Sequence, residues 1–343
     1  MKSRKYRLYP NNQQREQLQK NFGCVRFVYN WWLSLSQEKY SGYLLLAKQL
    51  TEKKKELLWL KDCYMNSLQH SLRNLDKAFQ NFFKKRSKYP KFKKKSNSQS
   101  VYYIQSIKIV KDFIQTPKIW LIKCNFHREC KWKIKSMTIT RTASWKYYVS
   151  ILTDFVEQKP SNTTAVGIDL WIKTFAVCSD WQTFDNPRFL KKSIKKLKKQ
   201  QRVLSRKDKW SNNRNKQRVI VARIYEKVKN QRQDFLHKAS TTIANKYWVV
   251  AMEKLNIKGM KKNHCLAQSI GDVSRGMFKA FLQYKTTVKE IWVFDPSSKK
   301  CIQCWNIKKD LSLKHRVYHC DNCGYIEDRD LMASKNILAM ANL

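Results

Sequence analysis

Acidic residues are scarce in this chain of 343 residues, and their scarcity narrows the class of partner. Asp and Glu together number 25 against 71 Lys and Arg, which gives a formal net charge of +46. An excess of this size does not define a fold. It does indicate a polyanionic partner, and nucleic acid is the simplest one.

Long apolar runs are also missing. No segment approaches the roughly 18 apolar residues that a membrane-spanning helix needs, so we expect no membrane segment. The first residues, MKSRKYRLYPNNQQ, are charged and lack the apolar stretch of a secretory signal. We therefore expect a cytoplasmic protein, whose ten cysteines meet reducing conditions that favour metal ligation over disulfides.

Glycine is the third scarce feature, with 7 residues among 343, or about 2% where about 7% is usual. Tryptophan, by contrast, occurs 12 times. Turns that require a positive φ therefore have few glycines to fill them.

The order of hydrophobic patterns along the chain indicates several domains, and the length favours two or three. Apolar residues recur at steps of three and four between residues 18 and 32 and between residues 68 and 82. This spacing predicts two amphipathic helices, the first capped by Asn11 or Asn12. From about residue 101 to 156 the period changes to two, which predicts antiparallel strands that form a small barrel.

Two strongly basic segments are candidate contacts with nucleic acid. SKYPKFKKKSNSQSVYY, residues 87–103, interleaves cations with aromatic rings, which can neutralise phosphates and stack on unpaired bases. Residues 188–218 carry fourteen cations and one acid, a density that favours a polyanion against them. A solvated loop and a solvated helix face are the alternatives. The candidate contact residues are Lys91, Lys93, Lys94, Lys195, Lys198, Lys199 and Arg202.

The last quarter contains the most specific local motif. Two C-x-x-C pairs, separated by fifteen residues, have the spacing of a zinc ribbon, in which four thiolates surround one ion. Four protein ligands leave no open position, so zinc here would be structural. The six other cysteines lack this spacing and are interpreted as small core residues or incidental thiols. The predicted zinc ligands are Cys301, Cys304, Cys320 and Cys323.

Three acids stand at the ends of elements, inside otherwise apolar sequence. Asp169 ends the run AVGID, Glu253 ends WVVAME, and Asp330 follows Asp328 at the start of a C-terminal helix. Buried carboxylates are costly alone and repel one another when clustered, unless a cation lies between them. Oxygen ligands suit Mg²⁺ or Mn²⁺, and a pair of such ions can catalyse phosphodiester hydrolysis. We therefore expect these acids to converge and hold metal.

The sequence resembles the TnpB family, which are transposon-encoded, RNA-guided relatives of the type V CRISPR effector nucleases. The resemblance rests on segments that appear in the family's order and cover nearly the whole chain. They are YRLYPN, GCVRFVYNW, YPKFKKK, GIDLWIKTFAV, MEKLNIKGM, the paired C-x-x-C motifs and DRDLMASKNIL.

This resemblance implies an α+β multidomain fold. A small antiparallel β-barrel would comprise residues 1–20 and 100–160, and a helical bundle would comprise residues 21–99. Residues 161–343 would form a RuvC-like nuclease domain, a mixed α/β domain of RNase H-like fold, with a zinc ribbon inserted at about 296–326. The N-terminal half would grip a guide RNA and a short motif beside the DNA target.

The resemblance also assigns roles to the acids. Asp169, Glu253 and Asp330 match the family's catalytic acids and would hold two Mg²⁺ ions, whereas Asp328 is accessory or a helix-end charge. The implied partners are guide RNA and target DNA. The implied assembly is a ribonucleoprotein with one copy of the protein, in the cytoplasm of a prokaryotic cell. Base pairing with the RNA would select the target.

Two departures from the family's pattern bear on activity. Met332 stands where the family has an asparagine, two residues after the last acid. Tryptophan occupies four turn positions where the family usually has glycine, and a bulky residue forced to positive φ costs about 1–2 kcal/mol. Either the organism reads UGA codons as glycine, or the protein has adapted these turns to tryptophan. The four residues are Trp145, Trp171, Trp181 and Trp305.

The leading interpretation is an RNA-guided DNA endonuclease of a transposable element, which cleaves target DNA beside a short flanking motif by two-metal phosphodiester hydrolysis. A first alternative is a TnpB-like repressor, which binds DNA with an RNA guide but cleaves weakly or not at all. The intact acid triad argues against it, and Met332 argues for it. A second alternative is an unguided RNase H-like nuclease, which would not need the large basic N-terminal half.

Overall fold

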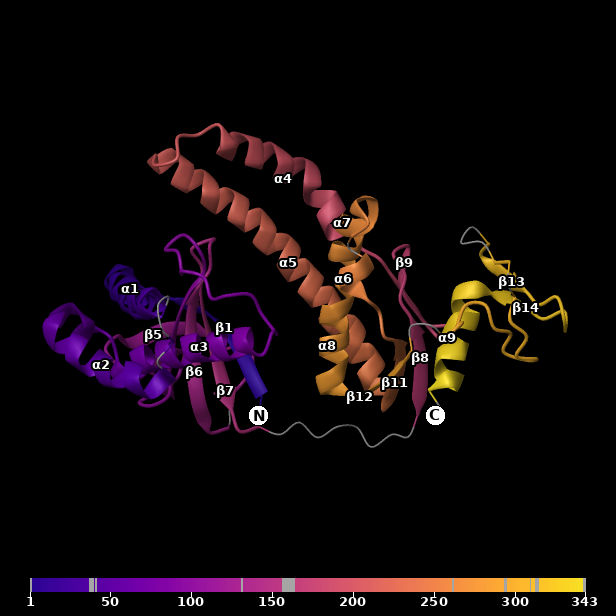
Figure 1. Ribbon diagram of the computed structural model, residues 1–343, viewed down its shortest axis with the longest axis horizontal. Helices are drawn as coiled ribbons and strands as arrows, with labels where there is room; N and C mark the ends of the chain where they lie inside the picture. The colour runs from indigo at the N-terminus through magenta and orange to yellow at the C-terminus, as the bar shows by residue number, and fades with distance from the viewer. Residues whose placement is uncertain are drawn as a thin grey trace. The chain divides into compact units, whose positions relative to one another are not determined.

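The chain forms two compact units, Met1–Glu157 and Gln158–Leu343 (Figure 1). The structure, a computed structural model, describes residues 2–36, 40, 42–130, 132–155, 164–260, 262–292, 295–308, 310–311 and 315–341. The domain boundary expected after residue 160 lies outside the described residues. Each unit has its own hydrophobic core, so the two are described separately.

Three helices and a 3-10 turn make up the helical part of the N-terminal unit: α1 (Asn12–Leu35), α2 (Gly42–Glu56), η1 (Leu58–Asp62) and α3 (Met65–Phe83). Asn11 caps α1, because its side chain and that of Gln14 each accept a hydrogen bond from the other's backbone amide. Both predicted apolar stripes are buried except for Phe82, which is half-buried. The buried members are Leu18, Phe22, Val25, Tyr29, Trp32, Leu68, Leu72, Leu75 and Phe79.

The N-terminal unit also contains one antiparallel sheet of seven strands, in the order β2-β6-β7-β1-β5-β4-β3. Its strands are β1 (Lys2–Tyr9), β2 (Gln99–Tyr103), β3 (Lys108–Val110), β4 (Phe113–Thr116), β5 (Trp120–Asn125), β6 (Ile134–Arg141) and β7 (Tyr147–Thr153). The predicted antiparallel strands are confirmed, but the barrel is not. A barrel closes when its edge strands pair, and no pairing between β2 and β3 is found in the part of the chain that the structure describes. Alternation predicts which face of a strand is buried, and it carries no information about closure.

The C-terminal unit is built on a mixed sheet in the order β10-β9-β8-β11-β12. Its strands are β8 (Ala165–Asp169), β9 (Thr174–Cys178), β10 (Thr183–Asp185), β11 (Val249–Glu253) and β12 (Thr287–Ile291). The first three pair antiparallel, whereas β11 runs parallel to both β8 and β12. The unit therefore combines a meander with parallel strands, as a mixed α/β domain does.

Helices cover both faces of this sheet (Figure 1). On one face, Ile168 of β8 shares a core with Leu236 of α5 (Asn212–Lys246) and Phe278 of α8 (Arg275–Lys285). On the other face, Ala251 of β11 packs with Ile337 of α9 (Arg329–Met340). Side chains alternate along a strand. Asp169 lies two residues after Gly167 on β8, and Glu253 lies two residues after Ala251 on β11. Both acids are therefore on the face of the sheet that α9 covers.

A long helical hairpin extends from the sheet of the C-terminal unit, formed by α4 (Phe189–Ser205) and α5 (Figure 1). Gln217 of α5 donates to the side-chain oxygen of Gln200 at 2.7 Å, and Gln201 donates to the Tyr225 hydroxyl at 2.8 Å. The remaining elements are α6 (Ile257–Met260), α7 (His264–Val273) and the short strands β13 (Val317–His319) and β14 (Ile326–Asp328). None of the described helices is long and apolar enough to cross a membrane.

Three of the four tryptophans expected at glycine-type turns do have positive φ: 63° at Trp145, 69° at Trp181 and 62° at Trp305. The expectation is wrong for Trp171, because the connection from β8 to β9 bends at residues 172–173 instead. Trp120, which no sequence motif selected, has a φ of 61°.

Candidate metal centres

Asp169 and Glu253 are the last residues of two neighbouring parallel strands. Met252 of β11 pairs with Ile168 of β8, so the next residue of each strand leaves the sheet at the same edge. The carboxyl ends of the strands are where open α/β sheets bind ligands. The structure thus brings together two of the acids that the sequence selected.

Helix α9 carries the third acid to the same face of the sheet. Gly167 lies so close to this helix that a Cβ atom there would be 2.0 Å from the carbonyl oxygen of Ser334. Only glycine permits such an approach of two backbones. Asp330, in the first turn of α9, is thereby held on the side of the sheet where Asp169 ends β8.

Replacing Gly167 with alanine should displace α9 and with it Asp330. The added Cβ meets backbone atoms, which cannot rotate away, so we expect a loss of about 1–3 kcal/mol in the free energy of unfolding. Thermal unfolding measures this loss. Gly271→Ala is the matched control, because nothing lies within 4 Å of its added Cβ and alanine favours the surrounding helix α7. Equal stability of the two variants would contradict the packing assigned to Gly167.

Burial and negative charge perturb the carboxyl group of Asp169, which is only 7% exposed. Burial, then the charge of Glu253, raise the pKa of Asp169 to about 7, and Asp330 adds to the rise. A hydrogen bond from the indole of Trp171 to Oδ2 opposes it. A carboxyl group with this pKa loses its proton readily near neutral pH when a cation stabilises the charge.

Asp330 has a buried oxygen atom, Oδ1, that makes no hydrogen bond. Its other oxygen lies 3.7 Å from Arg316, and Asp328 beside it caps α9 by accepting from the backbone amide of Asp330 at 2.9 Å. Burial, then the charge of Asp328, raise the pKa of Asp330. Unpaired buried oxygens are uncommon in proteins, and an anionic one suits a hard divalent cation. The acids therefore fit a magnesium or manganese ion.

Two residues at the acid edge were not predicted. The hydroxyl of Ser297 donates to Oε1 of Glu253, and the amide of Asn336 donates to the Ser297 carbonyl at 2.7 Å. Arg275, the first residue of α8, is buried; burial lowers its pKa, and the charges of Asp169 and Glu253 oppose this shift. Hydrophobic periodicity does not single out polar residues in connections or at helix starts, so no sequence pattern selects Ser297 or Arg275.

The three carboxylates share one face without forming a single tight cluster. Among the residues that the structure describes, only the four predicted cysteines each bring one ligand atom to within 4.8 Å of all the others. Two catalytic ions lie about 3.5–4 Å apart and need ligands spread over a wider space than one ion does. The arrangement of the acids is compatible with the two-ion case.

The four cysteine sulfurs are already spaced for a tetrahedral ion. The Sγ atoms of Cys301 and Cys323 lie 3.6 Å apart, and those of Cys304 and Cys320 lie 3.5 Å apart. Metal–sulfur bonds of about 2.3 Å place the sulfurs of a tetrahedron about 3.8 Å apart. His319, next in the chain to Cys320, is not part of this cluster. The donor set fits zinc.

Met332, the residue that replaces the family's asparagine, is fully buried beneath the cysteines. It shares a core with Cys301, Tyr318 and Cys320. Because Met332 belongs to α9, the cysteine cluster and the helix that carries Asp330 support each other through this core.

The basic loop of the N-terminal unit is fixed to α1 by Asn30. The side chain of Asn30 accepts from the backbone amide of Lys93 at 2.8 Å and donates to its carbonyl at 3.0 Å. The Lys93 ammonium lies 3.9 Å above the ring of Tyr29, and Lys91, Lys93 and Lys94 are all exposed. All three lysines are thus accessible to a partner, and Lys93 also contacts an aromatic ring.

The four candidate contact residues of the C-terminal unit share one face of α4. They follow the spacing i, i+3, i+4 and i+7, and all are exposed, whereas Leu197 between them is buried. Such a row of cations matches a nucleic-acid backbone better than scattered charges would. The row consists of Lys195, Lys198, Lys199 and Arg202.

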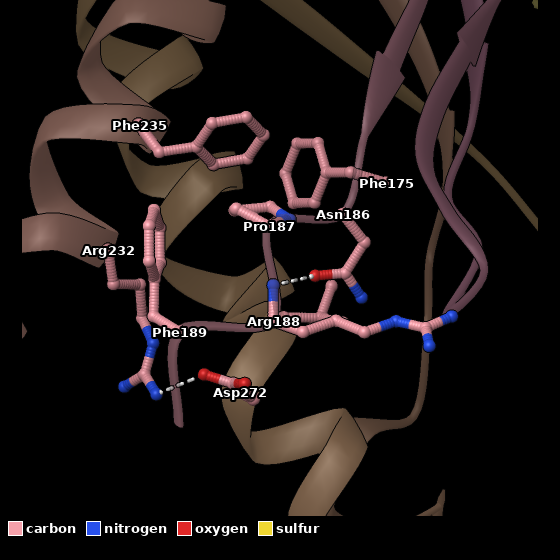
Figure 2. A pocket seen from close by; sticks show the side chains of 9 residues that line it. Phe175, Asn186, Pro187, Arg188, Phe189, Arg232, Phe235 and Asp272 are labelled. Carbon is pink, nitrogen blue, oxygen red and sulfur yellow. Dashed lines mark hydrogen bonds and ion pairs between the residues drawn. The ribbon is translucent and has the colours of Figure 1, made fainter. Parts of the chain in front are cut away.

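A small pocket at the base of the α4–α5 hairpin is separate from the acids (Figure 2). Aromatic rings, including those of Phe175 and Phe235, form its walls. Arg232 donates to Asp272 at 2.7 Å, and Asp272 also accepts from the backbone amide of Leu190 at the start of α4. These contacts hold the base of the hairpin in place, and none of the candidate acids lines the pocket.

Three segments of the chain match known protein families. Residues 143–264 match OrfB_IS605, described as "Probable transposase". Residues 1–43, which here contain β1, α1 and the start of α2, match the helix-turn-helix domain of the same family. Residues 276–337, which include the cysteine cluster and Asp330, match the TNB domain of Cas12f1-like proteins.

Two curated proteins are similar over almost the whole chain. A "Putative RNA-guided DNA endonuclease" of Streptomyces pristinaespiralis is 35% identical, over 98% of this chain and 88% of its own length. The "Putative RNA-guided DNA endonuclease InsQ" of Escherichia coli strain K12 is 30% identical, over 98% of this chain and 91% of its own.

One solved structure shares the fold over most of the chain. It is the Cas12f1 protein in a complex with sgRNA and target DNA, with a TM-score of 0.57 over 95% of this chain and 83% of that one. The identity is 12%, so this likeness concerns the fold alone.

Proposed function

Because the chain belongs to the TnpB family, we propose that it is an RNA-guided DNA endonuclease of a transposable element, which cleaves DNA with metal ions held by Asp169, Glu253 and Asp330. The observation that carries this proposal is that three acids, from β8, β11 and α9, lie on one face of the sheet. On this proposal the C-terminal unit is a RuvC-like domain of RNase H-like fold.

The residues around the acids have distinct roles in this mechanism. Two Mg²⁺ ions, when bound, supply an activated water and stabilise the oxygen that leaves phosphorus. Asp169 would give up its proton on binding such an ion, and the unpaired Oδ1 of Asp330 would be a further ligand atom. Ser297 orients the carboxylate of Glu253 through its hydroxyl. Arg316, beside Asp330, offers a positive charge for the DNA phosphate.

A structural zinc ion held by the four cysteines completes this account of the C-terminal unit. The set of four thiols leaves no open coordination position, so this ion would take no part in catalysis. Its role is to stabilise the core that the cysteines share with Met332, and hence the start of α9.

Guide RNA and target DNA are the partners that the charge of +46 suits. Base pairing with the RNA would select the DNA sequence, while the protein would hold the heteroduplex backbone and a short flanking DNA motif. The exposed rows on α4 and in the loop near Lys91 are the proposed backbone contacts. One copy of the protein provides one acid site, so we propose a single copy in each ribonucleoprotein.

A weak or inactive nuclease that binds DNA as a repressor is the second candidate. It is favoured by one contact, the hydrogen bond that Trp171 donates to Asp169, because this bond occupies an oxygen that a metal ion needs. The presence of all three acids favours the nuclease.

Sequencing the RNA that co-purifies with the protein tests the proposed guide. The protein should be expressed together with its native flanking DNA, because the family resemblance places the guide there. One dominant RNA that ends in a segment unrelated to the element is expected, and that segment names the DNA to test with Mg²⁺. A mixture of cellular RNAs would instead support indiscriminate binding by the positive charge and would favour the unguided nuclease.

A further inference from the structure

Tryptophan is concentrated in the left-handed backbone region of this protein. Ten described residues other than glycine have positive φ, and four of these are tryptophan, although tryptophan accounts for 12 of 343 residues. Positive φ is a genuine outlier for a bulky side chain and is ordinary for glycine. The four residues are Trp120, Trp145, Trp181 and Trp305.

Two of these tryptophans occupy the same position in equivalent hairpins. The backbone amide of Trp145 donates to the carbonyl of Thr142 at 3.0 Å, and the amide of Thr142 donates to the carbonyl of Lys146 at 2.9 Å. The hairpin between β9 and β10 repeats this pattern. There the amide of Trp181 donates to the carbonyl of Cys178 at 3.1 Å, and the amide of Cys178 donates to the carbonyl of Gln182 at 2.9 Å. A three-residue hairpin loop with these bonds places a left-handed residue at its last position, where glycine is preferred.

The two halves of the cysteine cluster provide an internal comparison for Trp305. In the second half, Gly324 follows Cys323, has a φ of 72° and donates to the carbonyl of Cys320 at 3.1 Å. In the first half, Trp305 follows Cys304, has a φ of 62° and donates to the carbonyl of Cys301 at 3.1 Å. The same turn is therefore made once with glycine and once with tryptophan.

The side chains of these four tryptophans fill no core. Their exposed fractions are 75% for Trp120, 54% for Trp145, 69% for Trp181 and 48% for Trp305. Three of the rings lie beneath a cation of the same unit, at 4.0 Å for Lys300 on Trp305 and at longer distances for the other two. Loss of the rings would thus open no cavity, and loss of Cβ would relieve the backbone.

We propose that the natural protein carries glycine at positions 120, 145, 181 and 305, because these codons are UGA and the organism reads UGA as glycine. Translation of the gene with UGA assigned to tryptophan would produce the present sequence, which contains 12 tryptophans and 7 glycines. The sequence comparison alone indicated three of these positions, and the backbone adds Trp120, which lies at the start of β5 after a three-residue loop.

The codons of the gene and the masses of peptides from the protein made in its own host test this proposal. UGA codons and glycine masses at all four positions are expected. UGG codons, or tryptophan masses, at these positions would overturn it.

A stability comparison tests the same proposal in the purified protein. Single changes of Trp120, Trp145, Trp181 and Trp305 to glycine are each expected to raise the melting temperature by about 2–8 °C. Each glycine variant should also melt above the alanine variant at the same position, because alanine keeps the Cβ that strains the backbone. Trp210→Gly is the matched control: Trp210 is 93% exposed and its φ is not positive, so no rise is expected.

Other outcomes of this comparison would count against the proposal. Glycine variants that melt no higher than the alanine variants would show that the turns do not need glycine. Unchanged melting with weakened RNA binding would show that the rings are stacking contacts for bases, and that tryptophan is the native residue.

Trp171 carries a second inference, which rests on the proposed function and on a different observation. Its indole N–H donates to Oδ2 of Asp169, and the guanidinium of Arg329 lies 5.9 Å from the ring centre. An indole nitrogen is only a donor, so it cannot join the ligands of a metal ion. We infer that Trp171 is a positioning residue that holds Asp169 away from metal and weakens its binding.

Calorimetric titration with Mn²⁺ tests this inference without measuring cleavage. Trp171→Phe keeps an aromatic ring and removes the N–H, so it should bind Mn²⁺ about tenfold more tightly than the unchanged protein, the effect of one hydrogen bond to a charged group. Trp210→Phe is the control and should bind as the unchanged protein does. Equal affinity of Trp171→Phe and the unchanged protein would overturn the inference.

The same titration distinguishes this inference from the proposed metal site. Asp169→Asn should abolish Mn²⁺ binding in either background. If it does so while Trp171→Phe has no effect, only the role of Trp171 is wrong. If Asp169→Asn leaves Mn²⁺ binding unchanged, the metal site itself is wrong.

Discussion

Replacing Asp169 with asparagine is expected to reduce DNA cleavage by about a thousandfold or more, while binding of guide RNA and target DNA is retained. Asparagine has nearly the same size, so the buried end of β8 stays packed, but it lacks the negative charge that holds a divalent cation. Cleavage of a target plasmid with Mg²⁺ gives the rate, and a gel-shift titration gives the affinity. Cleavage at the unchanged rate would contradict the catalytic assignment.

Two acids at the start of α9, Asp330 in its first turn and the N-cap residue Asp328, provide a matched pair for the same assay. Asp330→Asn should abolish cleavage, because its carboxylate lies on the face of Asp169 and has an unpaired buried oxygen. Asp328→Asn removes the same charge two residues away, and asparagine caps a helix as well as aspartate does. Asp328→Asn should therefore retain most of the cleavage. The reverse result would move the catalytic role to Asp328.

Replacing Cys320 with serine is expected to remove bound zinc and to unfold the region around the cysteine cluster. Structural zinc sites contribute about 10–16 kcal/mol of apparent binding free energy, which is lost with one ligand. Because Cys320 and Met332 share a core, the start of α9 should loosen as well, and cleavage should fall with stability. Elemental analysis measures the zinc, and thermal unfolding measures the loss of structure.

Cys265→Ser is the control for this prediction. Cys265 is an exposed thiol on α7 and does not belong to the cysteine cluster. This variant should keep one zinc ion for each chain and an unchanged melting temperature. Cys320→Ser with full zinc content and unchanged melting would contradict the zinc site.

The position of the acids was predictable because strand ends and helix starts leave a strong trace in the sequence. An apolar run that stops at Asp169 and another that stops at Glu253 indicate two buried strands with acids at their carboxyl ends. Gly167, two residues before Asp169, permits α9 to approach the sheet closely. This glycine is visible in the sequence, but no sequence pattern shows why it is needed. The spacing of the four cysteines was equally informative, since two short turns fix all four thiols.

Other features depend on tertiary structure that the sequence pattern does not encode. Alternation predicted the strands of the N-terminal sheet, but among the described residues their order leaves β2 and β3 as edges where a barrel was expected. Ser297 reaches Glu253 from a connecting segment, where no periodicity selects a polar residue. The left-handed turn at Trp120 follows a three-residue loop without the short-range signal that Asn-Gly or Asp-Gly would give.

The measurement that tests the central claim most directly is cleavage of two plasmids by the protein assembled with either of two guide RNAs. The RNAs should be identical except for the terminal segment that matches one plasmid or the other, with the same flanking DNA motif beside both targets. The account predicts that Mg²⁺-dependent cleavage follows the guide and disappears with Asp169→Asn. Cleavage of both plasmids regardless of the guide, or cleavage that persists after ribonuclease treatment of the protein, would contradict it.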